Sequence, residues 1–159
     1  MKEPVKRKSN LQKLLEELDK QELILEIEKL CAKFEVVKTY FEVELSGDAS
    51  KQLDKAKKEI DKQFYTSAGK ARNPKASRFN KIIRDFEQIS IYKEDVIILM
   101  IHRIEQTVKF ANKYGVNDAL YQSTARAVTK VEELITDEGL NDKYAVALTF
   151  FQSLDLPQK

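Results

Sequence analysis

The sequence has few of the residues that form metal centres and catalytic sites. Its 159 residues include one histidine, one cysteine and no tryptophan. Di-iron helical bundles use Glu-x-x-His pairs, whereas the residue three positions before His102 is Leu99. A zinc site needs several thiolate or imidazole ligands, and Cys31 is the single thiol of the chain. We therefore expect no metal site and no cofactor, and we predict that the protein is not an enzyme.

Glycine and proline are also scarce, with four and three residues, whereas charged residues make up 34% of the chain. Sandwiches and barrels need many turns, so this composition disfavours them and favours amphipathic helices. The 42% of hydrophobic residues and the net charge of +2 argue against a disordered chain. We predict an all-α fold of six to seven helices, arranged as an irregular helical bundle or as a short superhelix of helix pairs.

Long hydrophobic runs are missing from the sequence. The longest, from Val96 to Ile101, has six residues, whereas a helix needs about 20 to span a bilayer. The basic segment at residues 1–9 is not followed by the apolar region of a secretory signal. A lone cysteine forms no disulfide within the chain, so we expect Cys31 to be a small buried hydrophobic residue. These patterns predict a soluble cytoplasmic protein that does not bind membranes.

Helix signals divide the chain into three regions. We expect a flexible basic N-terminal arm at residues 1–9, a single all-helical domain at residues 10–153 and a C-terminal tail at residues 154–159. The domain shows no exact internal repeat and no break in composition. We therefore predict one folding unit with short connections between its helices.

Capping patterns predict where several helices begin and end. Asp19 followed by Glu22 is typical of a capping box. Asn73-Pro74 favours a helix that starts with the proline at its first position. The longest predicted helix covers residues 92–114, and Gly115 ends it.

Apolar residues recur at helical spacing in the first third of the chain. We expect one helix to begin after Ser9 and a second after Asp19. The pattern leaves open whether the second helix bends near Phe34 or a third helix begins there. In the first helix, the apolar residues at helical spacing are Leu11, Leu14, Leu15 and Leu18. The second helix is expected to have an inward side formed by Leu23, Ile24, Ile27, Leu30, Cys31 and Phe34.

The small net charge conceals a strong alternation along the chain. Residues 10–48 carry ten acidic and five basic side chains, a net charge of −5. Residues 49–84 carry eleven basic and three acidic side chains, a net charge of +8. Residues 85–159 return to a net charge of −4. The basic block is the sharpest non-random feature of the sequence.

Four lysines of the basic block are spaced as one stripe of a helix. Lys51, Lys55, Lys58 and Lys62 recur at i, i+4, i+7 and i+11, and further basic residues follow in a loop and the next helix. Such an arrangement can neutralise a row of phosphates, and Tyr65 could stack on an unpaired base. The candidate contacts to an anion or a nucleic acid are Lys51, Lys55, Lys58, Lys62, Tyr65, Lys70, Arg72, Lys75 and Arg78.

A structural explanation of the basic block competes with nucleic-acid binding. The lysines could form a solvated face that offsets the acidic helices, within the chain or across a subunit boundary. Arginine, which binds phosphates in a bidentate manner, supplies only three of the eleven basic residues. The isoelectric point of 8.5 is also below the value typical of nucleic-acid-binding domains. We favour the structural explanation.

The single histidine is the remaining candidate for catalysis. His102 follows an apolar run and precedes Arg103, at the edge of the central helix. A Ser-His or Cys-His pair would make it part of a hydrolytic site. We expect instead that His102 is a half-buried, hydrogen-bonded side chain.

Several segments resemble a known family. They are the run from Val108 to Gly115, the residues Asn117, Tyr121 and Ser123, the pair Gly139-Leu140, and Tyr144. Together with the leucine-rich N-terminal helix, they are similar to a bacterial family of small helical proteins, the domain-of-unknown-function family 6155. The resemblance implies an all-helical fold and a bacterial cytoplasmic origin. It assigns no functional residues.

These observations together favour a protein that acts by binding. We expect a non-enzymatic helical module whose partner is another protein or a second copy of the chain. The alternative is a nucleic-acid-binding protein that uses residues 51–84. A more remote alternative is a hydrolytic enzyme centred on His102.

Overall fold

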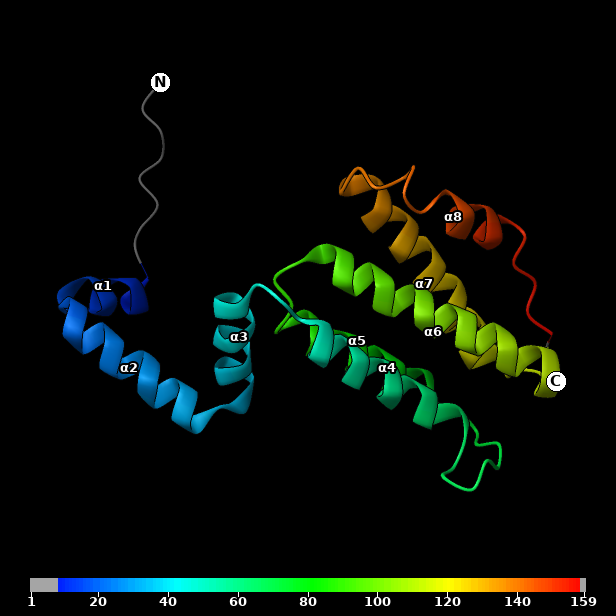
Figure 1. The fold of residues 1–159 in the computed structure, drawn as a ribbon, viewed down its shortest axis with the longest axis horizontal. Coiled ribbons are helices and arrows are strands. Elements are labelled where there is room, and N and C mark those ends of the chain that lie inside the picture. Colours follow the sequence, from blue (N-terminus) through cyan, green and yellow to red (C-terminus); the bar gives the residue numbers. More distant parts are fainter. Residues whose placement is uncertain (1–8, 158–159) are drawn as a thin grey trace.

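The computed structural model describes residues 9–157, and this part of the chain forms eight helices and no strand (Figure 1). The all-helical prediction is confirmed, and the count of six to seven is corrected to eight. An extended residue, Phe34, ends one helix and begins the next, so the chain does not bend there within a single helix. The helices are α1 (Asn10–Glu17), α2 (Lys20–Lys33), α3 (Glu35–Ser46), α4 (Ser50–Phe64), α5 (Ala76–Glu87), α6 (Lys93–Tyr114), α7 (Asp118–Asp137) and α8 (Ala145–Gln152).

The predicted basic arm at residues 1–9 lies outside the described residues, except for Ser9. The predicted tail at residues 154–159 is described as far as Pro157. Within residues 9–157, no helix combines the length and the apolar character that crossing a membrane requires.

Two of the three predicted helix caps are confirmed. Asp19 and Glu22 form both hydrogen bonds of a capping box, at 2.8 and 2.9 Å. Gly115 donates its backbone N–H to the last turn of α6, as predicted. The start of α5 was predicted wrongly, because Lys75 is still extended and α5 begins at Ala76. Pro74 is instead a buried residue of the preceding loop.

The core is built around α6, which contacts α4, α5 and α7 (Figure 1). Nine of its residues are buried, and this is why its apolar residues cover more than one face. An aromatic cluster joins three of the helices: the ring centroid of Phe64 lies 5.1 Å from that of Phe79 and 5.4 Å from that of Phe110. The C-terminal segment completes the core, since Phe151 and Leu156 are buried.

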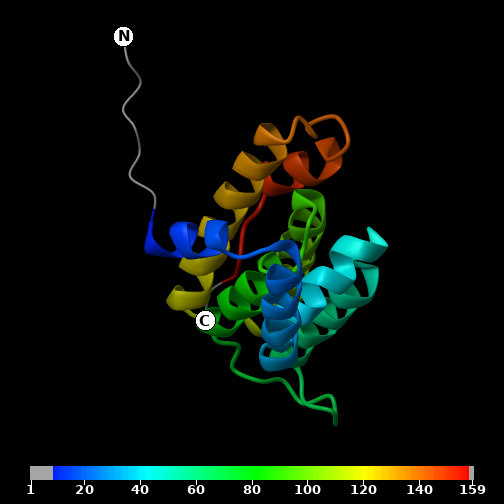
Figure 2. The same cartoon turned by 90° about the vertical axis from the view of Figure 1, so that its left-hand side faces the viewer.

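The first two helices lie outside this core. α1 and α2 bury no residue, and α2 packs on α3 (Figure 1). Figure 2 views the molecule from this end, with α1 and α2 nearest to the viewer. The prediction that the apolar side of the second helix faces inward to the core is therefore wrong. Helical periodicity identifies an apolar face, but it does not say whether another element covers that face.

Cys31 illustrates the same correction, because it is half-buried on α2 rather than part of the core. The chain exposes 11298 Å², whereas a compact protein of this mass exposes roughly 8,000 Å².

Candidate functional site

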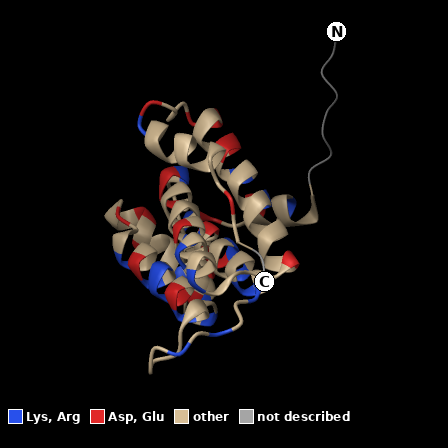
Figure 3. Cartoon of the chain, turned by 90° about the vertical axis from the view of Figure 1, so that its right-hand side faces the viewer, with Lys and Arg blue, Asp and Glu red and all other residues tan. Residues whose placement is uncertain are grey.

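The lysine stripe predicted from the sequence is exposed on α4. Lys51, Lys55, Lys58 and Lys62 lie on the side of the helix opposite its buried residues, which are Leu53, Ala56, Ile60 and Phe64. Figure 3 shows basic segments along α4 and in the loop that follows it. This stripe faces away from α5 and α6, against which α4 packs.

Most of the basic block has no acidic partner among the described residues. Lys62 pairs with Glu59 at 2.6 Å, and Lys81 pairs with Asp85, one turn away on α5. Between the acidic segment at residues 10–48 and the basic block at residues 49–84, the described part of the chain contains no ion pair. Among the described residues, the acidic side chains at residues 10–48 therefore form no ion pair with the lysines of the basic block.

The loop between α4 and α5 is held closed at its base. The backbone N–H of Arg72 donates to the carbonyl of Phe64 at 2.8 Å, and Tyr65 forms an isolated bridge with Ala71. This closure places Lys70 and Arg72 beyond the end of the lysine stripe. Lys75 and Arg78 follow, exposed, at the start of α5.

Tyr65 belongs partly to the core. Its ring packs edge-on against Phe110 and Tyr114, with centroid distances of 5.9 and 6.3 Å. The side chain is half-buried. These contacts occupy part of the ring that the sequence suggested for stacking on a base.

His102 is half-buried and hydrogen-bonded, as predicted. Its Nε2 lies 2.8 Å from Oδ1 of Asp61, so the pair joins α6 to α4. Among the described residues, no hydrogen bond joins His102 to a serine, a threonine or a cysteine. The residues predicted for the nucleic-acid surface do not include this pair.

An exposed apolar surface on the first three helices was missed by the sequence reasoning. We define the N-terminal apolar surface as Leu11, Leu14, Leu15, Ile24, Ile27, Leu30, Phe34, Val36 and Tyr40, each of which is between 37% and 64% exposed. The sequence contained the signal, since most of these residues formed the predicted stripes. The error lay in assigning the apolar side of the second helix to the core.

A groove of about 410 Å³ runs between α3, α4 and α5, beside this surface. Val36, Lys55 and Ile89 are among its lining residues. The side-chain oxygen of Gln52, which also lines it, is buried and has no hydrogen-bond partner. The groove therefore combines apolar walls with an unsatisfied acceptor.

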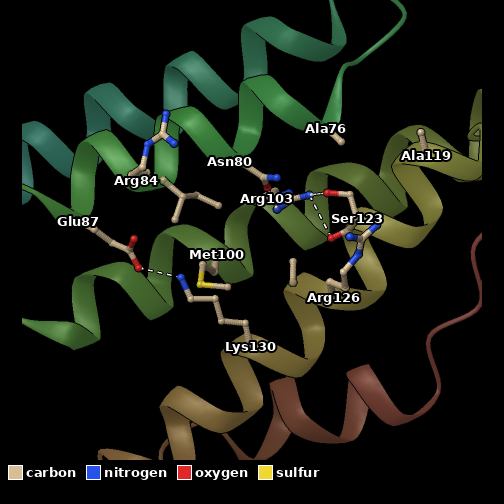
Figure 4. A pocket seen from close by; sticks show the side chains of 12 residues that line it. Ala76, Asn80, Arg84, Glu87, Met100, Arg103, Ala119, Ser123, Arg126 and Lys130 are labelled. Carbon is tan, nitrogen blue, oxygen red and sulfur yellow. Dashed lines mark hydrogen bonds and ion pairs between the residues drawn. The ribbon is translucent and has the colours of Figure 1, made fainter.

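A buried arginine is the second feature that the sequence reasoning missed. Arg103 on α6 is 2% exposed, and burial lowers its pKa to about 10. Its Nη1 donates to Oδ1 of Asn80 at 3.2 Å. Its Nη2 donates to Oγ and to the carbonyl of Ser123, at 2.6 and 3.3 Å (Figure 4). The guanidinium also lies over the ring of Phe79, 5.3 Å from its centroid.

Arg103 lines a cavity of about 590 Å³ between α5, α6 and α7 (Figure 4). The other lining residues are Ala76, Asn80, Ile83, Arg84, Glu87, Met100, Ala119, Ser123, Arg126, Ala127 and Lys130. The sequence carried one signal for this site. Arg103 stands four residues after Leu99 and four before Thr107, so it occupies a core position of an apolar helix.

The described residues contain no group of three or more side chains that could hold a metal ion. The chemistry available in the cavity is instead hydrogen bonding by guanidinium, amide and hydroxyl groups.

One protein family matches the chain. The sequence model of the family described as "Family of unknown function (DUF6155)" covers residues 6–159, and this match confirms the resemblance seen in the sequence. No curated protein and no solved structure matches the chain.

Proposed function

Since the chain belongs to the DUF6155 family, whose function is unknown, we propose from its surfaces that it is a self-associating helical interaction module. It binds a second copy of the chain through the N-terminal apolar surface. It acts by binding and not by catalysis. We propose further that the protein acts in the bacterial cytoplasm.

The observation that carries the proposal is that two well-capped amphipathic helices contain no buried residue. α1 has 8 residues and α2 has 14. Isolated helices of this length are marginal in water, and most helical stability in proteins comes from packing an apolar face. An amphipathic helix that lacks an internal partner is suited to an apolar groove on another molecule.

Charge complementarity favours a second copy as the partner. The helices that carry the N-terminal apolar surface belong to the segment of net charge −5, and the exposed lysines of α4 belong to the segment of net charge +8. Among the described residues, these two surfaces form no ion pair with each other. If two copies exchange their first two helices, the acidic helices α1 and α2 of each copy can contact the lysine stripe on α4 of the other.

The available area is sufficient for such an interface. The chain exposes roughly 3,000 Å² more than a compact protein of its mass. A stable interface of standard size buries about 1,600 Å² in total. The groove between α3, α4 and α5 lies beside the lysine stripe and offers a seat for the partner's apolar side chains.

Light scattering across protein concentration tests self-association. We expect the unmodified chain to pass from monomer to dimer between low micromolar and millimolar concentration. The double variant Ile24→Ser/Ile27→Ser should raise the dissociation constant at least about tenfold, because it removes apolar area from the interface.

The control is Val146→Ser on α8, which also removes an exposed apolar side chain, here one that is 86% exposed. It should leave the dissociation constant unchanged. A chain that stays monomeric throughout, or an equal effect of Val146→Ser, would contradict the proposal.

Nucleic-acid binding is the second candidate, because the stripe on α4 is exposed and largely unpaired. A labelled single-stranded oligonucleotide titrated at several salt concentrations tests it. Binding should weaken steeply as salt rises, and Lys55→Glu/Lys62→Glu should abolish it. Ile24→Ser/Ile27→Ser should have no effect on this binding. If the oligonucleotide binds equally well to the lysine double variant, this candidate is rejected.

A further inference from the structure

The cavity between α5, α6 and α7 contains a buried positive charge, Arg103, that forms no ion pair with a carboxylate of the described residues. Buried arginines are usually paired with an acid, because removing a charge from water is costly. Arg103 is held instead by Asn80, Ser123 and the ring of Phe79, which are all neutral. Nothing among these contacts compensates the charge of the guanidinium.

The hydrogen bonds of Arg103 are also incomplete. A guanidinium has five N–H donors, and the structure accounts for three of them. The Nε of Arg103 is buried and has no partner. A buried donor without a partner costs about 1–3 kcal/mol, so it calls for an acceptor.

The partners of Arg103 keep donors of their own. Asn80 accepts from Arg103 through Oδ1, so its amide NH₂ group stays available. Ser123 accepts through Oγ, so its hydroxyl proton stays available. Both side chains line the cavity. The floor of the cavity therefore offers N–H and O–H donors around a fixed positive charge.

The rim of the cavity adds further positive charge. Arg84 from α5 and Arg126 from α7 are exposed, and neither forms an ion pair among the described residues. Lys130 pairs with Glu87 at 3.0 Å across the opening. With Arg103, the lining carries four basic side chains and one acidic side chain.

We propose that this cavity binds a small organic phosphate, whose phosphate group contacts Arg103, Arg84 and Arg126. Clustered arginines recognise phosphate oxygens through charge-assisted hydrogen bonds. The net positive charge of the lining suits a dianion better than a single carboxylate.

The walls explain why the ligand is organic rather than free phosphate. Ile83, Met100 and Ala127 provide apolar surface beside the arginines. The volume of about 590 Å³ is typical of small-molecule sites and far exceeds the size of one phosphate ion. This cavity is separate from the N-terminal apolar surface, so either proposal can fail without the other.

Isothermal titration calorimetry with three probes tests the proposal. We expect phenyl phosphate to bind about tenfold more tightly than inorganic phosphate, because only phenyl phosphate also contacts the apolar walls. It should also bind about tenfold more tightly than benzoate, which carries one negative charge. Absence of binding by phenyl phosphate at millimolar concentration would overturn the proposal. Equal binding of phenyl phosphate and inorganic phosphate would contradict the proposal that the ligand has an organic part that contacts the apolar walls. Tighter binding of benzoate than of phenyl phosphate would contradict the proposal that the charged group is a phosphate.

Exposed arginines allow a test that does not disturb the fold. Arg84→Gln and Arg126→Gln should each weaken phenyl phosphate binding about tenfold, the usual loss for one charge-assisted hydrogen bond. The matched control is Arg78→Gln, an exposed arginine on α5 that does not line the cavity. Equal weakening by Arg78→Gln would indicate general electrostatic attraction and reject the site.

The buried donors require a second variant, because Arg103→Ala removes core volume and can unfold the protein. Ser123→Ala keeps the volume nearly unchanged and removes only the hydroxyl. We expect it to weaken phenyl phosphate binding about fivefold, with the circular dichroism spectrum unchanged. If Ser123→Ala binds phenyl phosphate as tightly as the unmodified chain, the buried side chains of the cavity do not contribute to binding, which contradicts this part of the proposal.

Discussion

At the scale of single residues, Glu94 joins the start of α6 to the start of α8. The hydroxyl of Tyr144 donates to Oε1 of Glu94 at 2.9 Å, and Lys143 forms an ion pair with the same oxygen. The hydrogen bond from Lys143 is the main cause that lowers the pKa of Glu94, and the bond from Tyr144 adds to it. Burial raises the pKa of the Tyr144 hydroxyl, as does its bond to Glu94.

This lowered pKa predicts a stability that depends on pH. A carboxyl whose pKa is lower in the folded state stabilises the protein above its unfolded value of 4.5. That contribution is lost as the pH falls through the lower folded value. We expect Glu94→Gln to reduce the free energy of unfolding by about 0.5–1 kcal/mol near neutral pH, since the side chain is partly exposed. The difference from the unmodified protein should shrink progressively as the pH falls below 4.5.

Urea unfolding at several pH values measures this effect. Glu105→Gln is the matched control, because Glu105 is an exposed carboxylate on the same helix. It should change the free energy of unfolding by less than about 0.5 kcal/mol at every pH. A loss in Glu94→Gln that persists at low pH would show that the charge of Glu94 is not what stabilises the contact.

Arg103 shows how far sequence reasoning reaches at this scale. Its place four residues after Leu99 could have marked it as a charged residue in a core position. The cavity beside it could not be predicted, because its lining residues come from α5, α6 and α7 and meet only in the folded chain. The sequence alone also gave no means of seeing that Arg84 and Arg126 line the same opening.

At the scale of helices, local sequence signals were sufficient to predict the helix caps, but they did not predict which helix faces are buried. The capping box of α2 and the glycine cap of α6 were predicted correctly, because caps depend on residues within one turn. The burial of a face depends on distant elements. α2 has an apolar face and contains no buried residue although it packs on α3, whereas α7 has a similar face that buries Leu120, Val131 and Ile135.

This contrast predicts different effects of the same cap removal. Asp19→Ala and Asn117→Ala each remove a side chain that accepts a backbone N–H at the start of a helix. We expect Asn117→Ala to lower the global free energy of unfolding by about 1 kcal/mol, because α7 is part of the core. Asp19→Ala should leave the global value unchanged in the monomer, because α2 buries nothing.

Hydrogen exchange locates the effect of Asp19→Ala. At low protein concentration, the amides of α2 should exchange about fivefold faster in the variant than in the unmodified chain, as a local loss of about 1 kcal/mol implies. A global destabilisation by Asp19→Ala equal to that of Asn117→Ala would mean that α2 unfolds together with the core.

At the scale of the whole molecule, the charge alternation is related to the position of α1 and α2, which lie outside the core and belong to the acidic segment. The sequence predicted blocks of opposite sign and left open whether they meet within the chain or between subunits. Within the described residues the acidic segment and the basic block form no ion pair. The opposite charges of these two segments are therefore not paired with each other within the described part of the chain.

Removal of the first two helices tests this arrangement. A chain that begins at Phe34 should keep its free energy of unfolding within about 0.5 kcal/mol at low micromolar concentration, because α1 and α2 add no buried residue. The same chain should remain monomeric at every concentration. The control is a chain that ends at residue 143, which lacks Phe151 and Leu156 and should lose about 3 kcal/mol or more. If the first deletion is as costly as the second, α1 and α2 stabilise the core.

The backbone of Phe34 determines the direction in which the first two helices extend from α3. Phe34 is the one residue between α2 and α3, so the direction of α2 depends on a single pair of backbone dihedral angles. α2 has 14 residues and is about 21 Å long, so a rotation of about 10° at Phe34 moves its far end by about 4 Å. The part of the N-terminal apolar surface that lies on α1 and α2 is therefore positioned by the backbone angles of Phe34, whereas Val36 and Tyr40 belong to α3.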